Sequence, residues 1–441
     1  MQRGRGTAIV VVVLLLLLTA LLAGCGSNAT TTTQASTATT AAPPTTGSTP
    51  TSVTPTTGGA TPTSAAGPAT GEPIKVGVII SLTGAAASPS ASTLNAIQLE
   101  VEAINAAGGV NGRPIALSIE DDGSDLQKAT SAATKLIEQT KVAAVLGPFI
   151  PYGVPAVKEI TEKAQVPEII YMAPTMTDLG MKMKWSFSVG QSIPYNAQCF
   201  MELFQKEGYK KILTIADSLP TSVDHIPVLQ DLIKANGGQP ELVVMPDTWN
   251  DGDPDVSPII TKIADQLKST KPDALLLLSN VVHFPIISKG LKGLGFTLPI
   301  ICEPSIPLPV SLQMQGPEAL EGVIGPSAGI INAAEIPADD PAKQLLMDVT
   351  ARYTAKYNQP PDMFAGFGYD AIHILYNAML TAGDDRAKIR DAIEATKDWQ
   401  GTTGTFTYTA DDHVGVHNGY YVWKVVGGQF KYQYTCSPQK Q

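Results

Sequence analysis

The sequence predicts an α/β protein of two lobes, each with a parallel sheet that helices cover on both faces. Short apolar runs alternate with helical patterns from residue 74 to residue 171, which is typical of parallel strands joined by helical crossovers. The same alternation begins again after Tyr195. About 370 residues lie in this part of the chain, which is more than one hydrophobic core usually holds, so two lobes are expected.

The first lobe opens with an apolar run at residues 74–81. A helical pattern follows, with Leu94, Ile97, Val101 and Ile104 on one face. The same periodicities predict strands at residues 115–120, 142–146 and 168–171, and helices at residues 126–138 and 154–164.

The second lobe repeats this order of elements. Its predicted strands are residues 211–216, 241–245, 274–279 and 299–302, and its helices lie around residues 199–206, 228–235, 258–267 and 284–294. The C-terminal third is less regular, with helices predicted at residues 341–357, 368–380 and 387–395 and strands at residues 405–408, 419–426 and 429–434. Gly427 and Gly428 are expected to form a hairpin turn between the last two strands.

The N-terminus has the order of a secretory signal: Arg3 and Arg5, an apolar run at residues 8–18, then small residues before Cys25. The run is short for a membrane span. Residues 22–25 resemble the lipobox of bacterial lipoproteins, which implies a signal peptide at residues 1–24 and acylation of Cys25. The alternative is an ordinary secretory signal with an incidental cysteine. Residues 25–72 are almost wholly Thr, Ser, Ala, Pro and Gly, so we expect a disordered tether, with or without glycosylation.

Charge and cysteine content restrict the partners. Removing Arg3 and Arg5 from the 30 basic residues leaves 28 against 40 acidic ones, a net charge of −12, which argues against a nucleic-acid partner. Three cysteines remain after Cys25, and an exported chain can oxidise two of them. The sequence leaves their pairing open, and three buried thiols are an equal alternative.

The stretch INAAGGVNGRPIALSIEDDGSD at residues 104–125 resembles the type 1 periplasmic-binding proteins, in the branched-chain amino-acid (Leu/Ile/Val) branch of ABC-transporter receptors. Weaker matches lie at residues 75–84, 253–279 and 364–379. The resemblance implies two Rossmann-like lobes joined by a three-strand hinge, with crossings near Gln191, Gly322 and Ala410. Lobe 1 would then comprise residues 73–191 and 322–410, and lobe 2 residues 192–321 and 411–441.

In such sheets ligands lie outside the carboxyl ends of the strands. In relatives, hydroxyl and main-chain N–H groups hold the ligand's carboxylate and an acid of the second lobe meets its ammonium, and Glu303 is similar in position to that acid. The loop at residues 147–152 departs from the pattern, because it has no Ser or Thr and contains two prolines. With Val281 and Phe284 also near strand ends, an apolar cleft for a hydrophobic carboxylate or amide is expected. The predicted ligand-binding residues are Phe149, Ile150, Tyr152, Ala173, Thr175, Tyr195, Asp217, Asn280, His283 and Glu303.

The resemblance implies a substrate-binding component of an ABC importer, not an enzyme. It is expected to capture a small amino-acid-like or more hydrophobic molecule by hinge closure, without cofactor or metal. Its partners would be the ligand, the ABC permease subunits and the membrane, through the N-terminal lipid of an extracytoplasmic monomer. A lipid-anchored ligand sensor on the same fold is the alternative.

Three motifs suggest other chemistry. Residues 325–329 match a Gly-x-Ser-x-Gly nucleophile elbow, so a serine esterase acting through Ser327 is a distant alternative. Residues 366–371 resemble a dinucleotide fingerprint, but no strand precedes them, and a helix start is preferred. Residues 251–255 space acids like a calcium loop, yet Val256 and Lys262 stand where glycine and an acid are needed.

Overall fold

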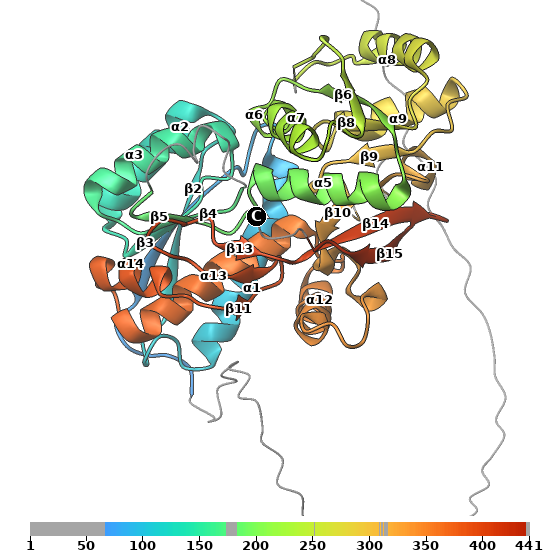
Figure 1. Cartoon of the computed structure of the whole chain (residues 1–441). Coiled ribbons are helices and arrows are strands. Elements are labelled where there is room, and N and C mark those ends of the chain that lie inside the picture. Colours follow the sequence, from blue (N-terminus) through green and yellow to red (C-terminus); the bar gives the residue numbers. More distant parts are fainter. Residues whose placement is uncertain are drawn as a thin grey trace, which may run out of the picture. The chain divides into compact units, whose positions relative to one another are not determined.

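The computed structural model describes residues 67–172, 183–250, 252–307, 309, 312 and 316–437. Pro62–Gln441 form one compact unit, which contains two large sheets flanked by helices (Figure 1). This confirms the predicted α/β class with open, mostly parallel sheets. The signal peptide at residues 1–24, the lipidation at Cys25, residues 25–66 of the tether predicted at residues 25–72, and the site residues Ala173 and Thr175 fall outside the described residues.

The first sheet has five parallel strands in the order β2-β1-β3-β4-β5. β1 lies between β2 and β3 and is nearly fully buried, which explains its continuous apolar run. The elements are β1 Ile74–Ile80, α1 Ala87–Ala106, β2 Ile115–Asp121, α2 Leu126–Thr134, η1 Lys135–Thr140, β3 Ala144–Leu146, η2 Pro151–Gly153, α3 Val154–Ala164, β4 Glu168–Ile170 and β5 Ser186–Ser188.

The second sheet has seven strands in the order β15-β14-β10-β9-β8-β6-β7. β6 to β10 are parallel, whereas β14 joins β10 and β15 in antiparallel pairs. The elements that follow β5 are α5 Ile193–Glu207, β6 Lys211–Ala216, α6 Pro220–Val223, α7 His225–Ala235, β7 Glu241–Val244, α8 Ser257–Thr270, β8 Ala274–Leu278, α9 His283–Gly293, β9 Ile300–Cys302, α11 Pro317–Leu320 and β10 Ile324–Ala328.

β10 lies in the second sheet, where Ile324 pairs with Ile301 and with Lys424. The return crossing expected near Gly322 precedes this strand, and the chain leaves the second sheet only after Ala328. The remaining elements are η3 Gly329–Glu335, α12 Lys343–Tyr357, α13 Met363–Ala382, α14 Arg386–Glu394, β11 Trp399–Gln400, β12 Thr405–Phe406, β13 Val416–His417, β14 Tyr420–Val426 and β15 Gln429–Thr435.

α13 returns to the first lobe and lies beside α1, although the two helices are far apart in the sequence (Figure 1). Buried Asp370 on α13 accepts hydrogen bonds from the main-chain N–H and hydroxyl groups of both Thr402 and Thr403. The carbonyl oxygen of Thr403 in turn accepts a hydrogen bond from Nε2 of Gln191. Two segments near the predicted crossings are thereby tied to one helix.

The end of the chain is fixed by a disulfide between Cys199 on α5 and Cys436, just after β15. Val425 and Phe430 pair in the hairpin, whose turn contains Gly427 and Gly428, both with positive φ. The predicted hairpin turn is thus confirmed. Cys302 on β9 stays a buried free thiol.

Candidate ligand-binding cleft

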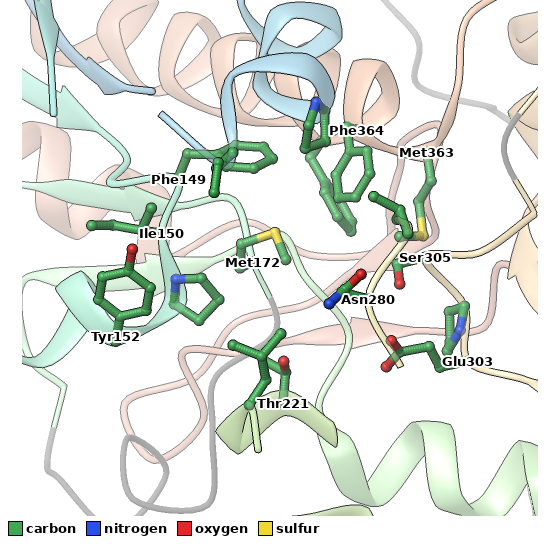
Figure 2. A pocket seen from close by; sticks show the side chains of 18 of the residues that line it. Phe149, Ile150, Tyr152, Met172, Thr221, Asn280, Glu303, Ser305, Met363 and Phe364 are labelled. Atoms are coloured by element: carbon green, nitrogen blue, oxygen red, sulfur yellow. The ribbon is translucent and has the colours of Figure 1, made fainter. Parts of the chain in front are cut away.

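A cavity of about 200 Å³ lies between segments that follow the strands of both sheets (Figure 2). Its volume equals that of roughly seven liquid waters, which suits a small molecule. Residues of the first sheet and of α13 form what we call the first wall: Ala85, Ala86, Pro89, Ser124, Phe149, Ile150, Pro151, Tyr152, Met172, Met363, Phe364 and Phe367. The second wall consists of Ile193, Asn196, Leu219, Thr221, His225, Asn280, Val281, Val282, Glu303, Pro304, Ser305 and Tyr420.

The loop after β3 carries the apolar part of the first wall. It leaves the strand at Gly147, whose φ is +109° and where a Cβ atom would lie 2.2 Å from the carbonyl oxygen of Ile79, so only glycine fits. The loop then presents Phe149 and Ile150, while the hydroxyl of Tyr152 donates to the carbonyl of Ser124 over 2.8 Å. Prolines at two of its positions have no N–H, which leaves few main-chain donors for an anion.

The start of α13 completes the first wall. Asp362 caps this helix by accepting a hydrogen bond from the N–H of Ala365 over 2.9 Å, and it is held by the hydroxyl of Ser92 over 2.7 Å. The cap positions Phe364, whose ring centroid lies 5.5 Å from that of Phe149. Figure 2 shows these two rings side by side at the edge of the cavity. Together with Phe367 they make an aromatic surface.

Asn280 is held on the second wall by the strand ends beneath it. Its backbone N–H donates to Asp217 over 2.8 Å, and its side-chain Oδ1 accepts from the N–H groups of Val282 and His283 at the start of α9. Its side-chain Nδ2 donates to Nδ1 of His283, 3.2 Å away on the same helix. Asn280 therefore lines the cavity in a fixed orientation.

The charges on the second wall are unbalanced. Glu303 is 8% exposed, and burial, with a further contribution from the negative charge of Asp217, raises the pKa of its carboxyl well above its usual range. Burial also lowers the pKa of His225 to about 4, so this ring is neutral at physiological pH. The lining residues that the structure describes include no lysine or arginine, so this part of the lining offers no cation to pair with a carboxylate.

The structure places the predicted site residues in two groups. Phe149, Ile150, Tyr152, Asn280 and Glu303 line the cavity, and Figure 2 shows them around it. The other three described residues lie behind the lining: Tyr195 packs edge-on against Tyr420, Asp217 accepts from Leu219 and Asn280, and His283 bonds to Trp249 and faces the carbonyl of Asp253. Direct ligand contact is accordingly proposed only for the first group.

Ser327 does not have the environment of a nucleophile. It lies fully buried on β10, where its hydroxyl donates to the carbonyl of Pro304 over 2.7 Å. A nucleophile elbow must expose its serine between a strand and a helix. Packing in the sheet accounts for the first glycine of the Gly-x-Ser-x-Gly match, because a Cβ at Gly325 would collide with Cys302.

Comparison with known proteins decides the family. A model of the family described as periplasmic binding protein matches residues 73–429. The chain belongs to the periplasmic binding protein family. In this periplasmic binding protein, the described residues contain no helix with the length and apolar character needed to cross a bilayer.

Individual relatives agree with this assignment. The Leu/Ile/Val-binding protein homolog 7 of Brucella abortus is 32% identical over 147 residues, but this alignment covers 32% of the chain and 35% of the relative, about a third of each. The Leu/Ile/Val-binding protein homolog 3 of Brucella melitensis is 24% identical over 76% of this chain and 87% of its own length. These relatives are binding proteins, not enzymes.

A solved structure resembles the fold. The substrate-binding protein LivJ of a branched-chain amino acid transporter from Streptococcus pneumoniae, crystallised with isoleucine, superposes with a TM-score of 0.71 at 25% identity. The match covers 82% of this chain and all of LivJ. The type 1 periplasmic-binding architecture is thereby confirmed for this periplasmic binding protein.

Several lining residues escaped the sequence analysis. Met363, Phe364 and Phe367 follow the apolar spacing of an ordinary core-facing helix, so nothing in the pattern marked them as cavity residues. Asn196 on α5 and Ser305 after β9 were also missed. Ser305 lies in one of the post-strand loops that the topology rule identifies, so that rule offered a signal for it.

Proposed function

We propose that this protein is the extracytoplasmic substrate-binding component of an ABC importer, anchored at Cys25 by lipid, working as a monomer and delivering a small amino-acid-like or more hydrophobic molecule to permease subunits. The observation that carries the proposal is the cavity whose two walls come from two different sheets. A ligand that contacts both walls stabilises the arrangement in which the walls are close. The closed form would then be the one that the permease recognises.

The ligand-contact role is proposed for Phe149, Ile150, Tyr152, Asn280 and Glu303, which line the cavity. Ala173 and Thr175, carried over from the resemblance, remain part of the proposal as candidate contacts near the end of β4. Lobe boundaries near Gln191 and Ala410 are likewise proposed, with the third after Ala328, where β10 ends, instead of near Gly322. Gln191 is bonded to the segment at Thr403.

The experiment measures ligand binding and closure on the full chain in mild detergent. Thermal unfolding is recorded with amino acids, amines, amides, aromatic acids and sugars, because a ligand that binds only the folded state raises the midpoint. A compound that raises the midpoint is then tested for a fall in the radius of gyration by solution scattering. If no compound raises the midpoint, or the one that does leaves the radius unchanged, the proposal fails.

A separate measurement tests the partner. The chain is co-expressed with the ABC permease subunits encoded beside it and purified with and without the ligand that raises the midpoint. Ligand-enhanced co-purification of the permease supports an importer. Co-purification of a receptor kinase in place of the permease would assign the protein to the sensor class.

A further inference from the structure

The two walls of the cavity differ in polarity. On the first wall the polar groups are already engaged with the main chain: the hydroxyl of Ser124 accepts from the N–H of Ala86, and the hydroxyl of Tyr152 donates to the carbonyl of Ser124. The rest of that wall is apolar side chains. Moving an alkyl or aryl group from water onto this wall is favourable by roughly 25 cal/mol per Å² of apolar surface buried.

The second wall carries hydrogen-bond acceptors that face a buried space. Asn196 is 5% exposed and its Oδ1 has no hydrogen-bond partner among the described residues. Glu303 stands on the same wall, next to the hydroxyl of Ser305, and forms no ion pair with any described cation. A buried acceptor without a partner is costly, so these groups favour a ligand that donates hydrogen bonds.

The charge on this wall is negative. The negative charge of Asp217 lies behind Glu303, burial and this charge favour the protonated carboxyl of Glu303, and His225 is neutral. A carboxylate in the cavity would meet this negative field without a lysine or arginine among the described lining residues. An ammonium group would instead favour the ionised carboxylate of Glu303, pair with it, and donate up to three hydrogen bonds to the acceptors around it.

We propose that the ligand is a hydrophobic primary amine without a carboxylate, whose alkyl or aryl part packs on the first wall and whose ammonium binds the second wall between Glu303 and Asn196. This inference rests on the proposed ligand-binding function and narrows it. The apolar loop at residues 147–152, with its two prolines, lacks the groups that would hold a carboxylate. The polar head is thus recognised by the second lobe and the apolar part by the first.

The test compares ligands that share a skeleton and differ only in the head group. Isoamylamine, leucine, isocaproate and isocaproamide form one series, and phenethylamine, phenylalanine, hydrocinnamate and hydrocinnamamide form another. Titration calorimetry on the full chain is expected to show one amine binding at least tenfold more tightly than the amino acid, carboxylate and amide of its series. Binding should also release a proton, seen as a heat that varies with the buffer, because the ammonium ionises Glu303.

Variants locate the head group. Glu303→Gln is expected to weaken amine binding at least tenfold, and so is Asn196→Leu, whereas Asn196→Asp keeps an acceptor and should retain it. Glu207→Gln, an exposed acid at the far end of α5, is the matched control and should leave the affinity unchanged. The unfolding midpoint of each variant shows that it is folded before binding is measured.

The outcomes separate this inference from the proposed function. Tighter binding of an amino acid, carboxylate or amide, or amine binding that survives Glu303→Gln, overturns the amine assignment while the receptor role stands. If neither series nor the wider panel binds, both proposals fall.

Discussion

The indole Nε1–H of Trp249 donates a hydrogen bond to Nδ1 of His283 over 3.1 Å. An indole is only a donor, so Nδ1 of His283 is the acceptor and Nε2 carries the proton. That proton points at the carbonyl oxygen of Asp253, 3.0 Å away. The ring therefore joins two loops behind the second wall and supports Asn280, whose Oδ1 accepts from the N–H of His283.

Replacing Trp249 by Phe removes one of the two donors at Nδ1 of His283 and leaves the side-chain amide of Asn280, 3.2 Å away. We expect the free energy of unfolding to fall by about 0.5 to 1.5 kcal/mol, the net contribution of one hydrogen bond. Urea unfolding measures the change. Trp185→Phe, at a partly exposed tryptophan just before β5, is expected to cost less than half as much. Equal losses would contradict the role given to His283.

Replacing Asp370 even by the similarly shaped Asn should destabilise the fold. Its carboxylate accepts at 2.6 Å and 2.9 Å from the N–H groups of Thr402 and Thr403, and from both of their hydroxyls. Asp370→Asn turns an NH₂ group toward these donors, so we expect a loss of about 2 to 4 kcal/mol of unfolding free energy. Asp411→Asn, at an exposed position, should change it by less than about 0.5 kcal/mol. If Asp370→Asn leaves the free energy of unfolding unchanged, the hydrogen bonds from Thr402 and Thr403 do not require a carboxylate.

Glu168 gives stability a defined pH dependence. It is fully buried, with the hydroxyls of Thr161 and Ser186 donating to it over 2.8 Å and 2.6 Å, and burial raises its pKa to about 7. Because the pKa in the folded state lies above the ordinary glutamate value of 4.5, the folded state holds the proton more tightly than the unfolded state. The contribution of the protonated Glu168 carboxyl to the free energy of unfolding is complete below about pH 4.5. It is lost as the pH rises through 7.

The measurement compares the wild-type chain with Glu168→Gln by urea unfolding from pH 5 to pH 8. The stability of the wild type relative to this variant should decline steadily over that range. Glu159→Gln, an exposed change on α3, the helix that precedes β4, should give a difference that is flat with pH. A flat difference for Glu168→Gln would mean that the carboxyl keeps an ordinary pKa, through the nearby charge of Lys158.

The disulfide between Cys199 and Cys436 closes a loop across a sequence separation of 237 residues. Replacing both cysteines by Ser is expected to lower the free energy of unfolding by about 2 to 5 kcal/mol. Reductant should lower the unfolding midpoint of the wild type and leave the double variant unchanged. Cys302→Ala, which removes the buried free thiol, is the control and should keep the sensitivity to reductant.

Regular elements were predictable because their periodicity is strong. The helix expected at residues 154–164 coincides with α3, and the strand expected at residues 274–279 ends one residue beyond β8. β5 was missed because Ser186–Ser188 is a three-residue strand with polar residues at both ends, too short to show a period. β10 contains Gly325 and Pro326, which weaken a strand pattern, and only pairing on both sides makes it a strand.

The cavity was harder to predict than the fold. The rule that ligands lie at the carboxyl ends of strands identified the loops that carry Phe149, Asn280 and Glu303. It does not say which side chain of a loop faces the cavity, and Asp217 and His283 turn out to hold the loops together. Phe364 comes from a helix start that reaches the cavity only through its packing on the first lobe, information that no local pattern contains.

The order of strands in the second sheet has a consequence for biosynthesis. β14 covers the edge of β10, yet it lies near the end of the chain. A polypeptide that emerges from the export channel N-terminus first would present β6 to β10 with one open edge until the last residues arrive. An open edge strand invites pairing with other chains, so a ribosome that stalls before Tyr420 would release a product prone to aggregation and in need of chaperones.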